Sequence, residues 1–426
     1  MTGPGGVATR RSAAEAVLRR RIEERTARCG VVGLGFIGAT LLNAVAAAGF
    51  PACGVDRSAA VVDRFGADGG DAIAVSDDVA ALAEADVVVV AVRVAPLPGG
   101  GMDLEPLDAV ASELAGLPDR PRLIVLVTTA PPGTTRAFAD RVGHAEHAFV
   151  AHAPERLQVD DAVWTVDRLP HVVGGLDDAS TELGARFVSA FAASVHPVSS
   201  PEVAELAKLL ENSFNAVGIA LIGELTRLAH ALGIEMAEVS AAAATKPFGY
   251  RAFHPGPGVG GHCIPNDLQM LREAGRTAGT PTPVLDAAGG VTRSMPADTV
   301  DRLAEILAGR GRELAGAEVL LVGLGFKIGT ADTTETPARD VARELRRRGA
   351  VPLGVDSRCD GLVVDGAPLG RVDHRTLGQG RGYDAAIVLA GDPGVAASAL
   401  GRSAAIVLDA GGGRALDGEL VAPWRL

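Results

Sequence analysis

Residues 29–56 read CGVVGLGFIGATLLNAVAAAGFPACGVD, and this stretch decides the fold of the first half of the chain. A short apolar strand runs into a glycine-rich turn, which is followed by an apolar helix over 39–48 and a second strand over 51–55 that ends at Asp56. Strand, turn, helix and strand in this order predict a βαβ unit of a parallel sheet. The turn carries the dinucleotide-binding pattern G-x-G-x-x-G in its proper place.

Each residue of this pattern has a physical task. Gly33 permits the tight turn, Gly35 lets a pyrophosphate approach the backbone, and Gly38 lets the helix pack against the strand. Asp56 follows 23 residues after Gly33, where it can accept hydrogen bonds from the adenosine ribose. We expect NAD as the cofactor, because a carboxylate repels the 2′-phosphate of NADP. Arg57 beside it is expected to be solvated.

The composition is that of a globular protein. The 426 residues, 47% of them hydrophobic and 22% charged, suffice for two or three packed domains. A net charge of -12 without a long basic run argues against nucleic acid and anionic membranes as partners. The four cysteines are far apart and show no metal-site spacing, so no disulfide framework, no metal and a reducing cytoplasm are expected. No apolar run is long enough for a membrane span or a secretory signal.

The chain before and after the first unit has its own pattern. We expect disorder over 1–11 and a charged helix over 12–26 that is capped by Ser12. Strands over 87–92, 123–128 and 148–151 alternate with helical segments and continue a parallel doubly wound pattern to about residue 200.

Residues 201–232 predict one amphipathic helix about 45 Å long at 1.5 Å per residue. Apolar residues recur along it at spacings of three and four, namely Leu206, Leu210, Phe214, Val217, Leu221, Leu225, Leu228 and Leu232. A helix of this length with such a stripe favours self-association into a homodimer or a higher oligomer. Lys208 and Asn212 lie off the stripe, four residues apart and therefore on a common face.

Residues 255–267, PGPGVGGHCIPND, deliver a cysteine to the start of an expected helix. The glycines let the backbone approach a ligand, and a thiol at a helix N-terminus feels the positive end of the dipole, which favours thiolate. Cys263 is therefore a candidate nucleophile. Asp267 lies one helical turn further on and suits proton handling better than thiol activation, because a nearby carboxylate disfavours thiolate. The alternative is a glycine-rich turn that carries a buried cysteine.

The last quarter of the chain echoes the first strand and turn. Residues 319–327, VLLVGLGFK, resemble 31–36, and the tripeptide ending at Asp356 matches the one ending at Asp56. A second Rossmann-like domain is the simplest account. Ile328 stands where the third glycine would be, so this turn is not expected to bind a second dinucleotide. A lysine on such a turn, Lys327, is placed for a phosphate or a carboxylate.

These motifs together resemble the UDP-glucose/GDP-mannose dehydrogenase family over nearly the whole chain. The stretch AATKPFGYRAFHPGPGVGGHCIP at 243–265 is most similar to the bacterial UDP-N-acetylglucosamine 6-dehydrogenase branch, as is the segment IEERTA at 22–27. The resemblance implies an α/β fold with two Rossmann-like doubly wound domains joined by a long central helix and a small helical dimerisation domain. The implied parts are an N-terminal extension (1–28), an NAD-binding domain (29–200), a central helical domain with the cysteine loop (201–300) and a C-terminal nucleotide-sugar-binding domain (301–426).

The resemblance also implies a metal-free reaction in which the C6 hydroxyl of a UDP-sugar becomes a carboxylate and two NAD molecules are reduced. Cys263 would form a thioester intermediate. Lys208 and Asn212 would stabilise oxyanion charge at C6, and Asp267 would move protons or orient water. Glu155, in APERL, matches the glutamate that assists thioester hydrolysis as a general base.

Further residues are carried over from matching positions. Thr129 matches a threonine near the nicotinamide, Lys327 matches a lysine that contacts substrate, and Arg251 matches an arginine that reaches into the neighbouring subunit's site. The cofactor-binding candidates are Gly33, Gly35, Phe36, Ile37, Gly38, Asp56, Arg57, Val94 and Thr129. The substrate-binding candidates are Glu155, Arg156, Leu157, Lys208, Asn212, Arg251, Gly260, Phe326 and Lys327.

The chain departs from the family pattern at three places. Residues 93–96, RVAP, stand where the family has a threonine-proline pair, so one hydroxyl contact to NAD is expected to be missing. Thr334 replaces an arginine after Lys327, and glycines at 411–413 followed by Arg414 replace a late Arg-Asn pair. These changes affect the choice of sugar more than the reaction. UDP-N-acetylglucosamine is the favoured substrate, with UDP-glucose and UDP-N-acetylmannosamine as alternatives.

Two further hypotheses stay open. One is oxidation of another nucleotide-linked alcohol in specialised metabolism, which a substrate panel would reveal. The other is a catalytically silent NAD-binding homologue. The presence of five candidate catalytic residues together argues against a silent protein, since packing alone does not require such a set.

Overall fold

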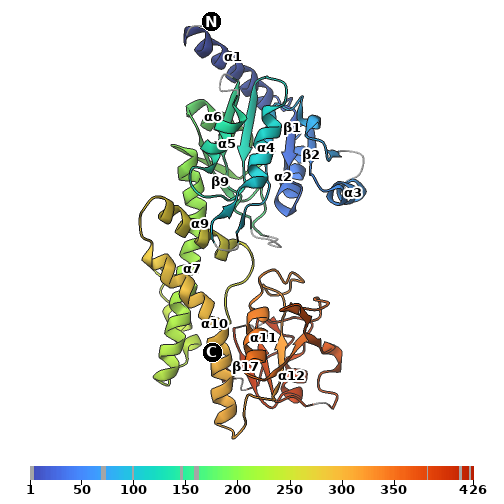
Figure 1. Ribbon diagram of the computed structural model, residues 1–426, viewed down its shortest axis with the longest axis vertical. Helices are drawn as coiled ribbons and strands as arrows, with labels where there is room; N and C mark the ends of the chain where they lie inside the picture. The colour runs from blue at the N-terminus through green and yellow to red at the C-terminus, as the bar shows by residue number, and fades with distance from the viewer. Residues whose placement is uncertain are drawn as a thin grey trace. The chain divides into compact units, whose positions relative to one another are not determined.

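The computed structural model describes residues 4–68, 73–97, 100–143, 147–157, 163–380, 382–411, 415–421 and 424–426. The chain divides into two compact units (Figure 1). The first comprises Met1–Glu211 and Gln269–Thr280, and the second comprises Asn212–Leu268 and Pro281–Leu426. The four expected domain ranges stay a prediction.

The first unit is built on an eight-stranded sheet in the order β10-β9-β8-β7-β4-β1-β2-β3. Its strands are β1 (Cys29–Val32), β2 (Ala52–Val55), β3 (Ala74–Ser76), β4 (Val87–Val90), β7 (Arg122–Leu126), β8 (Ala148–His152), β9 (Pro170–Gly175) and β10 (Ser194–Val198). The expected βαβ unit is confirmed, with Cys29 opposite Ala52 and Val32 opposite Val55 in parallel register.

One expectation about this sheet is wrong. The parallel pattern does not continue to residue 200, because β8 and β9 pair antiparallel, with Ala151 opposite Gly175. The described part of the connection over 153–169 forms no helix. A parallel neighbour needs a crossover connection, usually helical, so the chain returns in the opposite direction instead.

Helices cover both faces of the sheet. They are α1 (Pro4–Glu23), α2 (Phe36–Ala47), α3 (Ala59–Asp68), α4 (Glu105–Ala115), α5 (Thr134–Val142), α6 (Asp178–Val188), the short 3-10 helix η2 (Val79–Leu82) and the first turns of α7 (Pro201–Ala231). The unit also contains a small hairpin of β5 (Ala95–Pro96) and β6 (Met102–Asp103) and the segment Gln269–Thr280.

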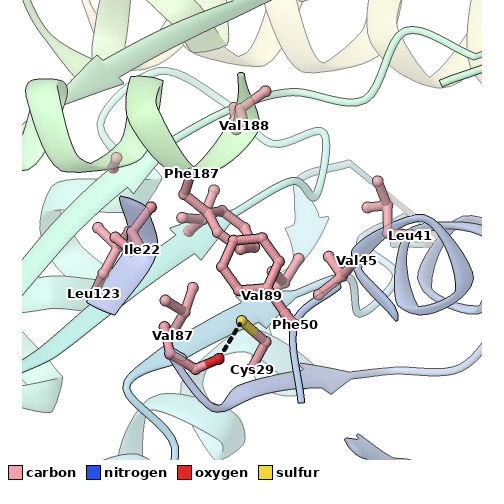
Figure 2. Close-up of a cluster of buried hydrophobic side chains, with 14 of the residues drawn as sticks. Ile22, Cys29, Leu41, Val45, Phe50, Val87, Val89, Leu123, Phe187 and Val188 are labelled. Atoms are coloured by element: carbon pink, nitrogen blue, oxygen red, sulfur yellow. Dashed lines mark hydrogen bonds between the residues drawn. The ribbon is translucent and has the colours of Figure 1, made fainter. Parts of the chain in front are cut away.

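Successive side chains of the buried strands belong alternately to two hydrophobic cores, one on each face of the sheet. In β4, Val87 and Val89 join the first core, whereas Val88 and Val90 join the second. This follows from the two-residue period of a strand. It also explains why a strand that is buried on both faces has an unbroken run of apolar residues in its sequence. The first core, shown in Figure 2, also contains Phe187 of α6. The second packs α4 and α5 onto the opposite face.

The N-terminal helix α1 belongs to the first core. It starts at Pro4, so disorder over 1–11 is wrong for the described residues, and Ser12 lies inside the helix instead of capping it. Tertiary contacts extend the helix, because Arg11 donates to the carbonyl of Ala148 at 3.0 Å and lies 4.3 Å from the ring centroid of Phe149. Figure 2 shows Ile22, from the end of α1, among the buried residues.

The second unit contains the rest of α7, then α8 (Met236–Ala243), the start of α9 (Cys263–Thr277) and α10 (Pro283–Ala308). A six-stranded parallel sheet follows in the order β15-β12-β11-β16-β17-β18. Its strands are β11 (Glu318–Val322), β12 (Val351–Val355), β15 (Gly370–Arg371), β16 (Ala385–Val388), β17 (Val407–Asp409) and β18 (Trp424–Arg425), with α11 (Pro337–Arg347), α12 (Ala397–Ser403), η3 (His374–Thr376) and the hairpin β13 (Val363–Val364) and β14 (Ala367–Pro368). The expected second Rossmann-like sheet is confirmed.

Helix α7 forms as expected and is one continuous helix of 31 residues. Most of its apolar stripe is exposed, with Leu210 63% and Leu221 54% exposed, whereas Val217 and Leu225 are half-buried. The opposite side of the helix is buried and carries mostly small residues, including Ala204, Ala216 and Ala220. Among the described helices, none is both long and apolar enough to cross a membrane.

Candidate active site

A cavity of about 320 Å³ opens at the carboxyl ends of β1, β2 and β4 in the first unit. Its lining includes Gly33, Gly35, Asp56 and Arg57, which are four of the cofactor-binding candidates. In an open α/β sheet, ligands bind at this edge, where the connections reverse direction. The topology therefore places the G-x-G-x-x-G turn beside a cavity at the edge of the sheet where ligands bind.

The glycines of the turn meet the requirements of a dinucleotide site. Gly33 has φ +87°, a conformation that L side chains rarely adopt. A Cβ at Gly38 would lie 1.7 Å from the carbonyl oxygen of Gly33, so only glycine lets α2 start there. A Cβ at Gly35 would meet no described atom within 4 Å, which leaves that side of the turn open for a pyrophosphate.

Asp56 ties the turn to the second strand. One carboxylate oxygen accepts the Leu34 N–H at 2.7 Å and the other accepts the Ser58 N–H at 2.9 Å. A carboxylate oxygen has two lone pairs, so each can accept a further hydrogen bond, and Asp56 lines the cavity. These residues fit NAD: Asp56 would bind the adenosine ribose and the amides of the turn would bind the pyrophosphate.

Other cofactor candidates lie elsewhere. Val94 is buried in the second core of the first unit, and the cavity is lined by its neighbours Val92 and Arg93 instead. Ile37 packs against the first core, whereas Phe36 is half exposed. Thr129 is half-buried at the end of β7 and does not line this cavity.

Sequence reasoning did not single out several residues of the cavity, namely Asp77, Val92, Arg93 and Glu113. A usable signal existed for two of them. Asp77 and Arg93 each follow a strand of the parallel sheet, and residues after such strands gather at one edge.

Glu155 lies just beyond β8 and is buried. One of its oxygens, Oε1, accepts the backbone N–H groups of Arg156 and Leu157 at 2.7 and 2.8 Å. The other, Oε2, is buried without a hydrogen-bond partner among the described residues. A carboxylate fixed through one oxygen with the other available has the form that a general base needs.

Arg156 and Leu157, both substrate candidates, have structural contacts. Arg156 forms an ion pair with Glu211 of α7 at 2.7 Å and donates to the carbonyl of Pro170 at 2.8 Å. Leu157 packs against the first core. Their roles in substrate binding stay predictions.

In the second unit, Cys263 is the first residue of α9 and its side chain is exposed. The alternative of a buried cysteine is therefore wrong. Asp267 lies one turn on and is buried, and its carboxylate accepts a hydrogen bond from the Asn212 amide at 2.5 Å. Two residues 55 positions apart in sequence are thus brought together beside the cysteine helix.

The glycines before Cys263 permit a close approach between the loop and the turn that follows β11. A Cβ at Gly261 would lie 2.9 Å from the ring of Phe326, and a Cβ at Gly260 would lie 2.7 Å from Pro337. The Gly261 N–H donates to the carbonyl of Thr334 at 3.2 Å. Thr334, the departure from the family pattern, therefore lies against the cysteine loop, while Lys327 is half-buried on the same turn.

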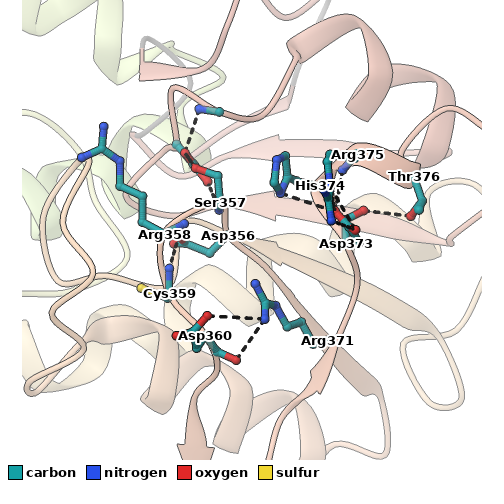
Figure 3. Close-up of polar contacts among 12 residues, drawn as sticks. Asp356, Ser357, Arg358, Cys359, Asp360, Arg371, Asp373, His374, Arg375 and Thr376 are labelled. Carbon is teal, nitrogen blue, oxygen red and sulfur yellow. Dashed lines mark hydrogen bonds and ion pairs between the residues drawn. The ribbon is translucent and has the colours of Figure 1, made fainter.

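The second glycine turn copies the first but is closed. Asp356 accepts the Leu324 N–H at 2.7 Å, as Asp56 accepts that of Leu34. Its other oxygen accepts the N–H groups of Arg358 and Cys359. Figure 3 shows these residues. A Cβ at Gly325 would lie 2.4 Å from the carbonyl oxygen of Thr330, so the chain itself fills the space that a pyrophosphate would need.

Arg251 lies in the loop before Cys263 and is exposed. Its guanidinium is 5.6 Å from the ring centroid of Phe253 and 6.0 Å from that of Phe214, a residue of the apolar stripe on α7. Across the described ranges, no three His, Cys, Asp or Glu side chains gather as a metal ion would need.

Comparison with known proteins agrees with this geometry. Residues 66–192 match the NAD binding domain of the UDP-glucose/GDP-mannose dehydrogenase family, and residues 202–293 match its central domain. The chain belongs to this family. It is therefore an NAD-dependent nucleotide-sugar dehydrogenase by family membership.

Individual relatives extend the match over most of the chain. A UDP-N-acetyl-D-mannosamine dehydrogenase of Pyrococcus horikoshii is 29% identical over 370 residues, which are 80% of this chain and 87% of that protein. A UDP-N-acetyl-D-glucosamine 6-dehydrogenase of Pseudomonas aeruginosa is 31% identical over 57% of this chain and 59% of its own length.

The fold is also that of a solved relative. The structure of a UDP-D-ManNAc dehydrogenase from Pyrococcus horikoshii matches with a TM-score of 0.80 and 26% sequence identity, over 90% of this chain and 95% of that one. The expected α/β architecture with Rossmann-like domains is confirmed.

Proposed function

We propose that this dehydrogenase oxidises the C6 hydroxyl of a UDP-N-acetylhexosamine to a carboxylate in two steps, through a thioester on Cys263. The observation that carries the proposal is the exposed thiol at the first residue of α9, one turn before the buried Asp267, whose carboxylate accepts a hydrogen bond from Asn212. Peptide N–H groups of a helix start favour the thiolate that must attack.

The chemistry divides among residues of the chain. NAD, when bound at the glycine turn, accepts the hydride that each oxidation releases from C6. The first oxidation leaves an aldehyde, and the Cys263 sulfur adds to its carbon to form a tetrahedral adduct. Loss of the second hydride gives the thioester. Water then replaces the sulfur, which releases the carboxylate product and restores the thiol.

Further residues are needed to stabilise the negative charge that develops on the C6 oxygen and to transfer protons. Lys208 and Asn212 lie one turn apart on one face of α7, and we assign to them the oxyanion that develops at the C6 oxygen. Asp267 is assigned to proton movement near the thiol. Glu155, with Oε2 available, is assigned to the activation of the hydrolytic water.

The N-acetylhexosamine is either UDP-N-acetylmannosamine or UDP-N-acetylglucosamine, sugars that differ only in configuration at C2. The second was the expectation from sequence. The first is at least as well supported, because the relative that matches over 87% of its length is named for UDP-N-acetyl-D-mannosamine. Both belong at the head of a substrate panel, followed by UDP-glucose. Lys327, Phe326, Gly260 and Arg251 remain the candidates for contact with the nucleotide sugar.

The test is the amount of NADH formed per limiting sugar. Two NADH per UDP-N-acetylhexosamine are expected, and the sugar that gives this ratio is the substrate. One NADH per sugar would exclude completion of the second oxidation. No NADH with any member of the panel would contradict the proposal and favour another nucleotide-linked alcohol or a silent protein.

Cys263→Ser separates the chemistry from cofactor binding. We expect NADH binding, followed by fluorescence titration, to be unchanged and steady-state turnover to be lost. Cys53→Ser is the matched control, since that cysteine lies in β2, away from α9 in the sequence and inside the first unit. Wild-type turnover in Cys263→Ser would overturn the assignment of the nucleophile.

A further inference from the structure

One carboxylate in the first unit, that of Glu205, is buried and yet fully bonded. Glu205 lies in the first turns of α7 and is 1% exposed. Its Oε2 accepts the Gly133 N–H at 2.6 Å, and its Oε1 accepts the N–H and the hydroxyl of Thr135 at 2.8 and 2.7 Å. Burial raises the pKa of Glu205, while these donors favour the charged form.

These contacts make Glu205 the cap of another helix. Helix α5 begins at Thr134, and the residue before it, Gly133, has φ +95° and no side chain to accept the first N–H groups. A helix start leaves such donors unsatisfied and carries a positive partial charge. A carboxylate from α7 supplies both the acceptors and the opposite charge, which makes these hydrogen bonds stronger than neutral ones.

The bonded chain continues to the strand that precedes Glu155. The Thr135 hydroxyl has one hydrogen, which it donates to Glu205, so it accepts from Nδ1–H of His152 at 3.0 Å. His152 is the last residue of β8 and is 1% exposed. Its Nε2 is then an acceptor, and it has no hydrogen-bond partner in the described part of the chain.

Three candidate residues of the proposed reaction lie close in sequence to Glu205 or to the groups bonded to it. Lys208 follows Glu205 by three residues on α7 and therefore lies on a neighbouring part of the same helix surface. The segment from β7 to Gly133 contains Thr129, the candidate at the nicotinamide. Glu155 follows His152 by three residues. All of these residues belong to the first unit.

We propose that Glu205, with Thr135 and His152, is a positioning network that holds the nicotinamide-side loop over 128–133 and the strand before Glu155 in register with the helix that carries Lys208. Glu205 touches none of the reacting atoms in this account. It acts through the residues it fixes, and a displacement of reacting groups by about 1 Å can lower a rate roughly 10²-fold. The inference rests on the proposed function, since it assigns roles to Lys208 and Thr129.

The experiment compares Glu205→Gln with Glu202→Gln on the same helix. Glu202 forms a half-exposed ion pair with Arg136 at 2.8 Å and also interacts with Ser200, but it caps no other described helix, so it is the matched control. We expect Glu205→Gln to lower kcat about 10- to 100-fold, with little change in KM for the nucleotide sugar. The control should keep both constants. The pair Thr135→Val and Thr135→Ser adds a rescue test, in which the serine hydroxyl restores the rate.

A second measurement needs no sugar. The emission of bound NADH reports the surroundings of the nicotinamide, and we expect its maximum to shift in Glu205→Gln but not in Glu202→Gln. An unchanged kcat and emission in Glu205→Gln would overturn the inference. So would equal losses of rate, NADH affinity and melting temperature, because these would make Glu205 a structural cap only. A wild-type protein that oxidises no sugar would count against the proposed function, and the emission shift would still decide the role of Glu205.

Discussion

At the scale of single residues, Lys208 offers the sharpest test of the oxyanion assignment. Its ammonium is expected to stabilise charge that exists on the C6 oxygen only during the reaction. Lys208→Ala should therefore lower kcat by a factor on the order of 10²–10³, as loss of an oxyanion donor does in other enzymes. Lys246→Ala is the control, because Lys246 is exposed and lies over the ring of Phe248 at 5.1 Å. If Lys208→Ala changed KM alone, Lys208 would bind substrate and would not stabilise the oxyanion.

His152 gives a prediction about pH. Burial lowers the pKa of this histidine to about 3 from 6.5. The folded protein therefore keeps it neutral while the unfolded chain binds a proton below pH 6.5, so stability falls as the pH drops from 6.5 toward 3. Between pH 7.5 and 5.5 the loss should be about 1 kcal/mol. Melting temperatures of wild type and His152→Asn at both pH values check this, and equal drops in the two proteins would exclude His152 as the cause.

The candidate residues differ in how far the sequence could specify them. The glycine turn and Cys263 were predictable because their chemistry depends on local spacing. The role of Val94 stays a prediction: it was inferred from a family position, and its side chain is buried in the core that contains β4 and α4. Glu205 carried no local signal. Its partners Gly133 and Thr135 are about 70 residues away, and only tertiary packing brings them together.

At the scale of elements, helix α1 shows how a terminal segment becomes part of a core. Leu18 is 0% exposed in the first core, whereas its neighbour Val17 is 36% exposed. Leu18→Ala should cost about 2–5 kcal/mol of stability. Val17→Ala should change it by less than about 0.5 kcal/mol. Chemical denaturation followed by circular dichroism measures both, and similar midpoints for the two variants would mean that α1 is dispensable.

Two helices mark the limits of local prediction. Residues 283–308 form α10 although Gly289, Gly290 and Pro296 interrupt its sequence pattern. Met295 and Val300 are buried beside these breakers, so packing in the second unit outweighs the weak local propensity. Conversely, α7 was predictable over nearly its whole length, because a stripe of apolar residues persists from Leu206 to Leu228.

At the scale of the whole molecule, the chain contains two related sheets with different uses. The similarity between residues 31–36 and 319–326 predicted these two sheets. In each turn, the N–H of the leucine that follows the first glycine donates to an aspartate at 2.7 Å. The first turn lines a cavity, whereas the second turn is covered at Gly325 by the chain itself. The difference lies in the residues after each turn, because the backbone of Thr330 covers Gly325 whereas α2 leaves Gly35 uncovered.

The outward face of α7 carries the last prediction. A stripe of exposed large apolar side chains on a single helix is unusual for a monomer, and we propose that a second copy of this chain covers it. Leu221→Glu would place an unpaired carboxylate in that interface, which costs several kcal/mol. Light scattering should give twice the 43.3 kDa chain mass for wild type and a single mass for the variant.

Val363→Glu is the matched control for this prediction, since Val363 is 57% exposed in the β13 hairpin and lies far from α7 in the sequence. Activity adds a second readout. The guanidinium of Arg251 lies 6.0 Å from the ring centroid of Phe214, which belongs to the stripe. If Arg251 contributes to the active site of the neighbouring subunit, dissociation of the dimer would remove it from that site. Leu221→Glu should then lower kcat together with the mass. A monomeric wild type would contradict the interface, and a fully active monomeric variant would contradict the role of Arg251 across it.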